Sequence, residues 1–448
     1  MIQNILSIVV ALGVLITFHE FGHYFIARRC GVKVLRFSVG FGKPIYRYVG
    51  KTGTEYTLAL IPLGGYVRML DEREGDVPES LKEQAFNSKN VWQRIAIVAA
   101  GPLANFLLAI VIYALVALMG IQTVAPKIGA ITDNSPLAQT NIQVGDELVS
   151  IADQSVNSWE DVNLVLASLI GKTEGIKVRY QVSETQMLQE TTTRLDRWLV
   201  GEQPNNLIRA FGIVPWQPNV APVIAQVVAD GAAQQAGFLA QDVILSIDEV
   251  AISNWQEVVD QVQLSPNQTL VVKVARDGQE RDLLLQPRVT ERDGREVGYA
   301  GLAVQPPVWD KSLIRENQYG VFESLSYGVG QTWNMVSLTV SSVVKMVQGL
   351  ISVDNLSGPI TIAKVASASA DSGLQPFLKF MAYLSVSLGV LNLLPIPMLD
   401  GGHLLFFGIE AARRKPVSER IQNLAYRIGA SLLFALMAIA IFNDIARL

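Results

Sequence analysis

The sequence is poor in the residues that usually bind metals or form cross-links. Its 448 residues include one cysteine, Cys30, and three histidines. A single cysteine excludes an internal disulfide and any Cys-x-x-Cys metal site. The formal net charge is only −4, and the basic residues gather beside apolar segments instead of forming one basic surface. These features exclude a disulfide scaffold and give no sign of a nucleic-acid partner.

Apolar residues, by contrast, are abundant. Half of the residues are hydrophobic and the mean hydropathy is +0.30, which is too apolar for an ordinary soluble enzyme. Four segments are long enough to cross a bilayer: about 5–27, 94–120, 376–398 and 424–442. The first begins MIQNILSIVV, without the basic residues that precede the apolar part of a cleaved signal peptide, so we expect it to stay attached.

Basic residues suggest how these segments are oriented. One cluster follows the first segment and a second lies between the third and the fourth; they comprise Arg28, Arg29, Lys33, Arg36, Lys43, Arg47 and Lys51, and Arg413, Arg414, Lys415, Arg420 and Arg427. Lys and Arg are enriched in cytoplasmic loops, so both clusters should face the cytoplasm. Both termini, and everything between the second and third segments, should then lie outside.

The long stretch between the second and third segments contains an internal repeat. Residues recur at an offset of 96 positions, as from Asp146 to Asp242 and from Trp159 to Trp255, without a gap. Each copy is expected to have a strand, a short Ser/Ala-rich helix, a strand introduced by Asp and then a helix after Trp. A period maintained over more than fifty residues predicts a duplicated β-rich domain. A following segment, about 326–351, is apolar at helical spacing yet rich in Ser and Thr, and we expect an amphipathic helix on the outer membrane surface.

The pentapeptide HEFGH, residues 19–23, lies near the end of the first apolar segment. On a helix His19 and His23 lie four residues apart on one face, the spacing that lets two imidazoles hold one Zn2+. Glu20 would then stand beside the metal, where a water molecule needs a base. The pattern can arise by chance, but ionisable groups inside a membrane are costly unless they are paired, which favours a functional site.

A further metal ligand is expected from the third apolar segment, which ends in LNLLPIPMLDGGH. Pro395 and Pro397 break the helix at membrane depth, which is tolerable only where the freed backbone lines a cavity in the protein. Asp400 follows this break and is the expected third ligand. His403 is expected either to fill a polar core position or to support the ligands.

Three motifs together resemble the site-two protease family of intramembrane zinc metalloproteases. They are HEFGH in the first segment, GPLANF in the second and N-x-x-P-x-P-x-L-D-G in the third. The duplicated insert resembles tandem PDZ domains, with Gln241 and Glu249 departing from the usual glycines. The resemblance implies a polytopic α-helical membrane protein with four transmembrane helices and two tandem PDZ-like α+β domains between helices two and three.

The resemblance also implies domain boundaries and residue roles. The implied parts are a first membrane part (1–120), two PDZ-like domains (121–218 and 219–308), a membrane-surface linker (309–375) and a second membrane part (376–448). His19, His23 and Asp400 match the family's zinc ligands, and Glu20 its general base. Asn392 matches a residue that binds the substrate backbone, with helix packing as the alternative. Gly64, Gly65, Tyr66, Val67, Arg68 and Met69 match a membrane-dipping β-loop that binds substrate, with an ordinary hairpin as the alternative.

The function implied is a zinc-dependent endopeptidase of the bacterial inner membrane. It would cut transmembrane segments of single-span proteins, such as an anti-sigma factor, in regulated intramembrane proteolysis, and remnant signal peptides are further candidate substrates. Its active site would lie within the bilayer near the cytoplasmic side, with the PDZ pair in the periplasm. That pair would exclude bulky substrates, bind peptide C-termini, or act only as a spacer. A catalytically silent PDZ scaffold and a metal transporter are the alternative functions.

Overall fold

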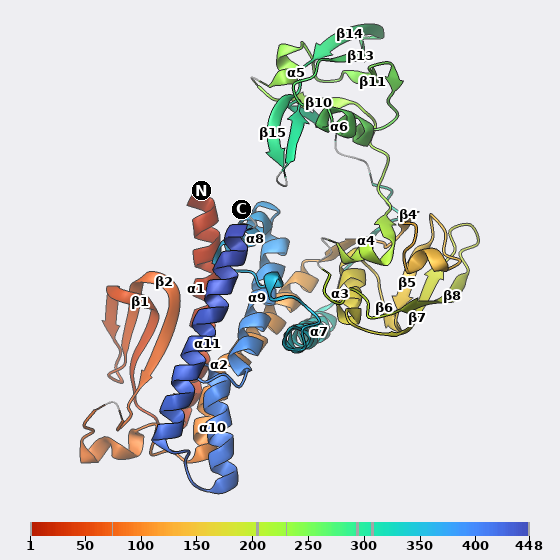
Figure 1. Ribbon diagram of the computed structural model, residues 1–448. Coiled ribbons are helices and arrows are strands. Elements are labelled where there is room, and N and C mark those ends of the chain that lie inside the picture. Colours follow the sequence, from red (N-terminus) through yellow and green to blue (C-terminus); the bar gives the residue numbers. More distant parts are fainter. Residues whose placement is uncertain are drawn as a thin grey trace.

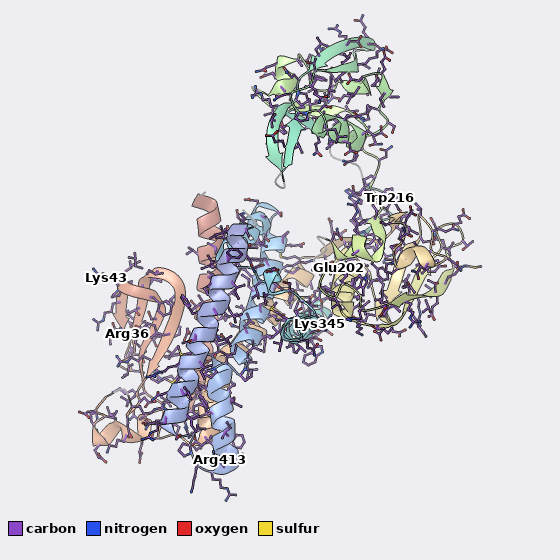
Figure 2. The ribbon with its side chains drawn as sticks, in the orientation of Figure 1. Arg36, Lys43, Glu202, Trp216, Lys345 and Arg413 are labelled. Atoms are coloured by element: carbon purple, nitrogen blue, oxygen red, sulfur yellow. The ribbon has the colours of Figure 1, made fainter. Side chains whose placement is uncertain are left out.

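The computed structural model describes residues 2–73, 75–202, 206–229, 231–292, 295–305 and 309–446 (Figure 1). Within these residues four helices are long and apolar enough to cross a membrane: α1 (Ile2–Arg29), α2 (Val91–Leu118), α9 (Leu374–Leu393) and α11 (Glu419–Ala446). They coincide with the four segments expected from the sequence, although the ends differ. Both chain termini lie at one end of the helical bundle, and Arg413 lies at the opposite end (Figures 1 and 2).

Helix α2 is the centre of this bundle, because α1, α7, α9 and α10 all pack against it. An Asn90–Gln93 capping box begins it, which satisfies backbone N–H groups that the first turn would otherwise leave unpaired. Small residues permit close helix crossings: a Cβ added at Gly22 of α1 would lie 2.2 Å from the Ala100 carbonyl oxygen. The bundle therefore brings α1 and α2 nearly into backbone contact beside the HEFGH sequence.

The third apolar segment is broken as expected, but earlier. Helix α9 ends at Leu393, and the chain is extended at Leu394 before the two prolines. Helix α10 (Asp400–Arg413) then begins at Asp400 itself, directly after the break. A Cβ at Gly401 would lie 2.2 Å from the Leu394 carbonyl oxygen, so only glycine allows this tight break.

Strands β1 (Val34–Val49) and β2 (Glu55–Met69) fold into a sheet beside α1. Both strands bend, and their register pairs residues 34–39 with 65–69, residues 36–39 with 55–58, and residues 44–49 with 55–59. The segment 65–69 therefore has a strand neighbour on one side only and is an edge of the sheet. The short helix η1 (Glu79–Gln84) follows before α2.

The duplicated insert contains two units with the same strand order. In the first unit the elements are β4 (Ile128–Ile131), η2 (Leu137–Gln139), β5 (Glu147–Ile151), β6 (Gln154–Ser155), α3 (Trp159–Leu169), β7 (Glu174–Gln181), β8 (Leu188–Leu195), α4 (Leu207–Phe211) and β9 (Ile213–Pro215). Its sheets have the order β6-β5-β7-β8 and β4-β9. Apolar side chains between sheet and helix, such as Leu148, Leu166 and Phe211, form its core.

In the second unit the elements are β10 (Ile224–Val227), α5 (Ala232–Gln235), β11 (Val243–Ile247), β12 (Val250–Ala251), α6 (Trp255–Gln263), β13 (Leu270–Arg276), β14 (Gln279–Leu285), β15 (Arg288–Arg292), β16 (Arg295–Tyr299) and β17 (Leu302–Val304). Its sheets have the order β12-β11-β13-β14, β15-β16 and β10-β17. The 96-residue offset holds for the first residues of the central strand and of the main helix. The Ser/Ala-rich helices expected in both copies are reduced to single turns, η2 and α5.

The chain leaves and re-enters the helical part through one pair of strands. Strand β3 (Ile121–Val124) follows α2 and pairs with β18 (Ile314–Asn317), which precedes α7 (Val321–Val347). Helix α7 buries Ser324, Gly328, Thr332 and Met335 and exposes the apolar side chains of Phe322, Trp333 and Val347, so its large apolar side chains face away from the helical bundle. It is not one of the four helices that could cross a membrane.

One buried carboxylate connects the last helix to the segment that follows α7. Helix η3 (Val353–Asn355) and helix α8 (Pro359–Asp371) follow α7. The buried Asp444 carboxylate of α11 accepts hydrogen bonds from the backbone N–H groups of Gly358, Ile360 and Thr361 and from the Thr361 hydroxyl. A carboxylate at a helix N-terminus satisfies unpaired N–H groups and interacts favourably with the helix dipole. Asp444 therefore joins the end of α11 to the start of α8.

Candidate metal centre

His19, His23 and Asp400 lie together at the centre of the helical bundle. The two Nε2 atoms are 3.2 Å apart, and Asp400 Oδ2 lies 3.2 Å from His19 Nε2 and 3.5 Å from His23 Nε2. Among the described residues these three form the one group of histidine, cysteine and acidic side chains close enough to share a metal ion. The residues come from α1 and α10, which are separated by almost the whole chain.

The donor atoms fit a zinc ion. Two ligands of a tetrahedral zinc ion with bonds of about 2.0–2.1 Å are about 3.3–3.4 Å apart, which matches the observed separations. Asp400 Oδ2 is buried and has no hydrogen-bond donor, although a buried charged oxygen is costly when it lacks a partner. Two imidazole nitrogens and one carboxylate oxygen are the donor set of many catalytic zinc sites, where a further position stays open.

Helix α2 orients both imidazole rings. His23 Nδ1 lies 2.9 Å from the Ile97 carbonyl oxygen, and only an Nδ1–H can make this bond, so the Nε2 lone pair points to the cluster. Asn105 Nδ2 lies 3.2 Å from His19 Nδ1, while the buried Asn105 Oδ1 lacks a donor. Rotating this amide by 180° lets Oδ1 accept from Nδ1–H, which leaves the His19 Nε2 lone pair directed at the cluster. The sequence reasoning missed Ile97 and Asn105, although Asn105 lies in the GPLANF motif.

Gly101 allows α2 to approach the rings. A Cβ at this position would lie 2.3 Å from His23 Nε2 and 2.9 Å from His19 Cε1. Any side chain here would displace the imidazoles. Glycine in GPLANF is therefore required by the geometry of the cluster.

Glu20 stands between two cavities. The first, the polar cavity, has a volume of about 380 Å³, and the second, the loop cavity, about 410 Å³; Glu20 and Asp400 line both. The Glu20 carboxylate also accepts a hydrogen bond from the Val67 backbone N–H. The carboxylate expected to act as a base thus lies beside the three donor atoms and against the edge segment of β2.

The expected substrate-binding residues are divided between these cavities. Gly64, Gly65 and Asn392 line the loop cavity, and Asn392 Nδ2 is 3.5 Å from His19 Nε2. Val67, Arg68 and Met69 line the polar cavity. The Tyr66 hydroxyl instead accepts a hydrogen bond from Arg36 on the neighbouring strand. The loop is therefore next to the cluster along most of its length.

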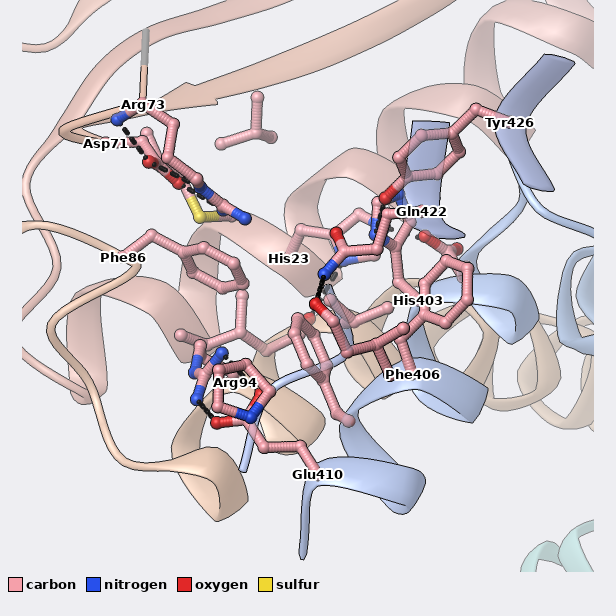
Figure 3. A pocket seen from close by; sticks show the side chains of 18 of the residues that line it. His23, Asp71, Arg73, Phe86, Arg94, His403, Phe406, Glu410, Gln422 and Tyr426 are labelled. Atoms are coloured by element: carbon pink, nitrogen blue, oxygen red, sulfur yellow. Dashed lines mark hydrogen bonds and ion pairs between the residues drawn. The ribbon is translucent and has the colours of Figure 1, made fainter. Parts of the chain in front are cut away.

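Figure 3 shows the polar cavity and the charged side chains around it. Asp71 pairs with Arg73, Arg94 pairs with Glu410, and His403 Nδ1 lies 3.4 Å from the Tyr426 hydroxyl. His403 lies in the first turn of α10 but is not among the three clustered donors. It lines the polar cavity beside them, next to the Tyr426 hydroxyl.

Comparison with known proteins agrees with this site. The model of the family described as peptidase family M50 matches residues 7–436. A putative zinc metalloprotease of Vibrio cholerae is 44% identical over 447 residues, 99% of each chain. The regulator of sigma-E protease of Escherichia coli K12 is 42% identical, also over 99% of each chain, and a related protease of Yersinia pestis is 45% identical. The chain therefore belongs to peptidase family M50, a family of metallopeptidases. It is a zinc metalloprotease, which sets aside the silent-scaffold alternative.

Part of the chain is also similar to a solved structure. The PDZ domain of an SdrC-like protein from Listeria monocytogenes covers 20% of this chain at 17% identity, and the chain covers 93% of that domain. The TM-score is 0.17, so no argument about the insert rests on it.

Proposed function

We propose that this protein is an intramembrane endopeptidase in which His19, His23 and Asp400 hold the zinc ion and Glu20 is the general base. The observation that carries the proposal is the convergence of two imidazole nitrogens with the buried Asp400 Oδ2, which has no hydrogen-bond donor, and the position of Glu20 beside them. Four apolar helices surround this cluster, which supports hydrolysis within the bilayer. A transporter would need ion ligands but gives no reason for Glu20 beside an edge strand.

The residues of the chain account for the proton transfers of peptide hydrolysis. When bound, zinc lowers the pKa of water and polarises a carbonyl group. Glu20 takes a proton from the attacking water and delivers it to the leaving amine. The Ile97 carbonyl and Asn105 hold the two rings in the tautomer that faces the cluster. Asn392 and the edge segment 65–69 lie beside the cluster, where they would hold the substrate backbone.

The substrate class follows from the location of the site. A transmembrane helix hides each carbonyl in its own hydrogen bonds, and exposing them in lipid costs several kcal/mol. The segment 65–69 has one open edge, to which an unwound substrate strand can add with replacement hydrogen bonds. Gly64 and Gly65 on one side of Glu20, and Val67 to Met69 on the other, would guide such a strand past the base.

We further propose that the substrates are single-span membrane proteins of the anti-sigma factor type. The support is the name of similar proteins, regulator of sigma-E protease, carried by chains that align over 99% of this one. Remnant signal peptides are further candidates because they too are single apolar helices. The basic residues at the Arg413 end support an inner-membrane topology with that end in the cytoplasm and the insert in the periplasm.

We assign the proposed domains as 1–120, 121–218, 219–308, 309–375 and 376–448, with residues 306–308 outside the described part. We propose that the two repeat units act as PDZ-like domains that exclude substrates with bulky outer domains. Support comes from the first unit, where Lys345 donates to the Ser168 carbonyl at the end of α3 and Lys379 pairs with Glu160 at its start. A unit held at both ends of α3 stays beside the helices where a substrate must enter.

Replacing residues 125–312 with a short Gly/Ser linker tests the filter, because β3 and β18 are kept. We expect the variant to cut a single-span substrate that retains a folded outer domain, which the intact protein should leave uncut. Both proteins should cut the trimmed substrate at similar rates. Loss of cutting on the trimmed substrate would instead indicate a docking function for peptide C-termini.

The central experiment compares the wild type with Glu20→Gln and Asp400→Ala, purified in detergent with a single-span substrate. Removing a general base typically costs about 10²–10⁴-fold in rate, so Glu20→Gln should retain zinc and lose nearly all cleavage. Asp400→Ala should lose both. Metal content by atomic spectroscopy and cleavage by gel are the measurements. Full zinc occupancy in Asp400→Ala would contradict the proposed ligand set.

A further inference from the structure

The two halves of the metal cluster are held by the same face of α2. Arg94, Ile97, Gly101 and Asn105 follow one another at helical spacing of three or four residues, which places them along one stripe. Ile97, Gly101 and Asn105 contact the imidazoles of α1, as described above. Arg94 lies at the other end of this stripe, one turn before Ile97, and it contacts α10 instead.

Arg94 binds α10 with its whole guanidinium group. Its Nη2 donates to Glu410 Oε1 at 2.6 Å and its Nη1 to Glu410 Oε2 at 3.2 Å, the parallel two-bond geometry that is strongest for this pair. Its Nε donates to the Lys89 carbonyl oxygen just before α2. The side chains of Arg94 and Glu410 are 13% and 18% exposed, so water screens this pair little.

The same guanidinium also covers an aromatic ring of α10. Its central carbon lies 4.9 Å from the centre of the Phe407 ring, which also lies 6.1 Å from the Phe86 ring and 6.4 Å from the His403 ring. Asp400, Phe407 and Glu410 are seven and three residues apart and therefore share one face of α10. Figure 3 shows Arg94 and Glu410 facing each other at the wall of the polar cavity.

We infer that Arg94 and Glu410 are positioning residues that fix the distance from Asp400 to the two imidazoles. Helix α10 follows α9 after the broken segment 394–399, and although it also contacts α9 and Tyr426 of α11, its chief packing partner is α2. Shifts of α10 along α2 would move Asp400 while leaving His19 and His23 in place. A two-bond, stacked and largely buried contact resists such shifts more than apolar packing does. The inference rests on the proposed metal site.

The test measures zinc affinity by chelator competition, together with kcat and KM on a single-span substrate, in the full chain in detergent. The variants are Glu410→Gln, which keeps the shape, Arg94→Lys, which keeps the charge, and the exchanged pair Arg94→Glu with Glu410→Arg. Glu190→Gln is the matched control, because Arg179–Glu190 is an ion pair of similar length on the exposed surface of the first unit. Size-exclusion chromatography and thermal unfolding report whether each variant is folded.

We expect Glu410→Gln and Arg94→Lys to weaken zinc affinity by about tenfold or more, the effect typical of residues that orient ligands. The loss should appear in kcat with little change in KM, and the exchanged pair should recover part of the affinity. Folded single variants with wild-type zinc affinity would overturn the inference, as would an exchanged pair that is folded but no better than either single variant. Equal zinc affinity in the wild type and Asp400→Ala would instead overturn the metal site itself.

Discussion

Two buried carboxylates in the helical part have opposite surroundings. Asp444 is 2% exposed and accepts three backbone N–H groups and one hydroxyl at the start of α8. Asp400 Oδ2 is equally hidden but has no donor, and its nearest neighbours are two imidazole nitrogens. Four donors explain why one charge can be buried without a metal ion. The absence of hydrogen-bond donors around Asp400 Oδ2 indicates that its partner is a cation. The hydrogen-bond donors around each carboxylate therefore distinguish the structural Asp444 from Asp400 of the proposed metal site.

A third buried carboxylate, in the second repeat unit, lies between these extremes. Asp242 is fully buried and receives two hydrogen bonds from Arg276 and one from the Leu239 N–H. Its counterpart in the first unit, Asp146, accepts the backbone N–H groups of Gln143 and Ser183 instead. The Arg276 guanidinium therefore gives Asp242 the positive charge that a metal ion would give Asp400.

The sharpest test of this comparison changes Asp400 and Asp444 to asparagine. Asp400→Asn should lower zinc affinity by more than about a hundredfold and abolish cleavage, because a neutral amide replaces the charged ligand. Without metal, the same variant should be at least as stable as the wild type, since its new N–H groups can donate to the imidazoles. Chelator competition and thermal unfolding in the presence of a chelator are the measurements. A metal-free Asp400→Asn protein that melts well below the wild type would refute the contrast.

Asp444→Asn should give the opposite result. The neutral side chain accepts fewer hydrogen bonds and leaves N–H groups of α8 unpaired, which should lower local stability by about 2–3 kcal/mol. Hydrogen exchange at Ile360 and Thr361 should become faster, while zinc affinity stays within twofold of the wild type. Simultaneous loss of zinc would show that this junction also supports the metal centre.

The smallest effect is expected at Asp242, and it depends on pH. Burial raises the pKa of the Asp242 carboxyl, but hydrogen bonds from Arg276 and the Leu239 amide outweigh burial and hold that pKa below its ordinary value. A group whose pKa is lower in the folded state stabilises the fold above its unfolded pKa and loses this effect as pH falls through the folded value. Asp242→Asn should therefore lower the free energy of local opening of β11 and β13 by about 1–3 kcal/mol near neutral pH. Hydrogen exchange in these strands should become correspondingly faster.

The difference between wild type and Asp242→Asn should be full above about pH 4 and shrink as the pH falls further. Asp146→Asn is the matched control, because Asp146 has no arginine partner among its hydrogen bonds described above. Its effect is measured by hydrogen exchange in β5 and β7. A difference that grows on acidification would contradict the assigned role of Arg276.

The sequence was most informative where chemistry depends on local spacing. Two histidines four residues apart predict one face of a helix, and two prolines predict the break before Asp400, because each rule acts within a few residues. The 96-residue offset of the repeat could also be predicted from the sequence, because both copies keep the same spacing between their matching residues. The helical start at Asp400 was not predicted, because it depends on how closely residues 401 and 402 pack against residues 393–397.

Other features depend on contacts between distant parts of the chain. The Arg94–Glu410 pair joins residues 316 positions apart, and nothing in either local sequence singles out its partner. The tie between His19 and Asn105 likewise appears only when α1 and α2 cross at Gly22 and Gly101. The open edge at 65–69 was expected from the family resemblance, but its position against Glu20 depends on how a bent hairpin folds back on itself.

Strands β3 and β18 have a consequence for the architecture as a whole. Because the chain departs and returns through two neighbouring strands, nearly two hundred residues are inserted at one narrow neck, and Lys345 and Lys379 also hold α3 of the first unit against the helices. The covalent path of the helical part is therefore independent of the length of the insert. Evolution, or a protein engineer, can exchange or trim the second unit with little change to the helices that carry His19, His23 and Asp400.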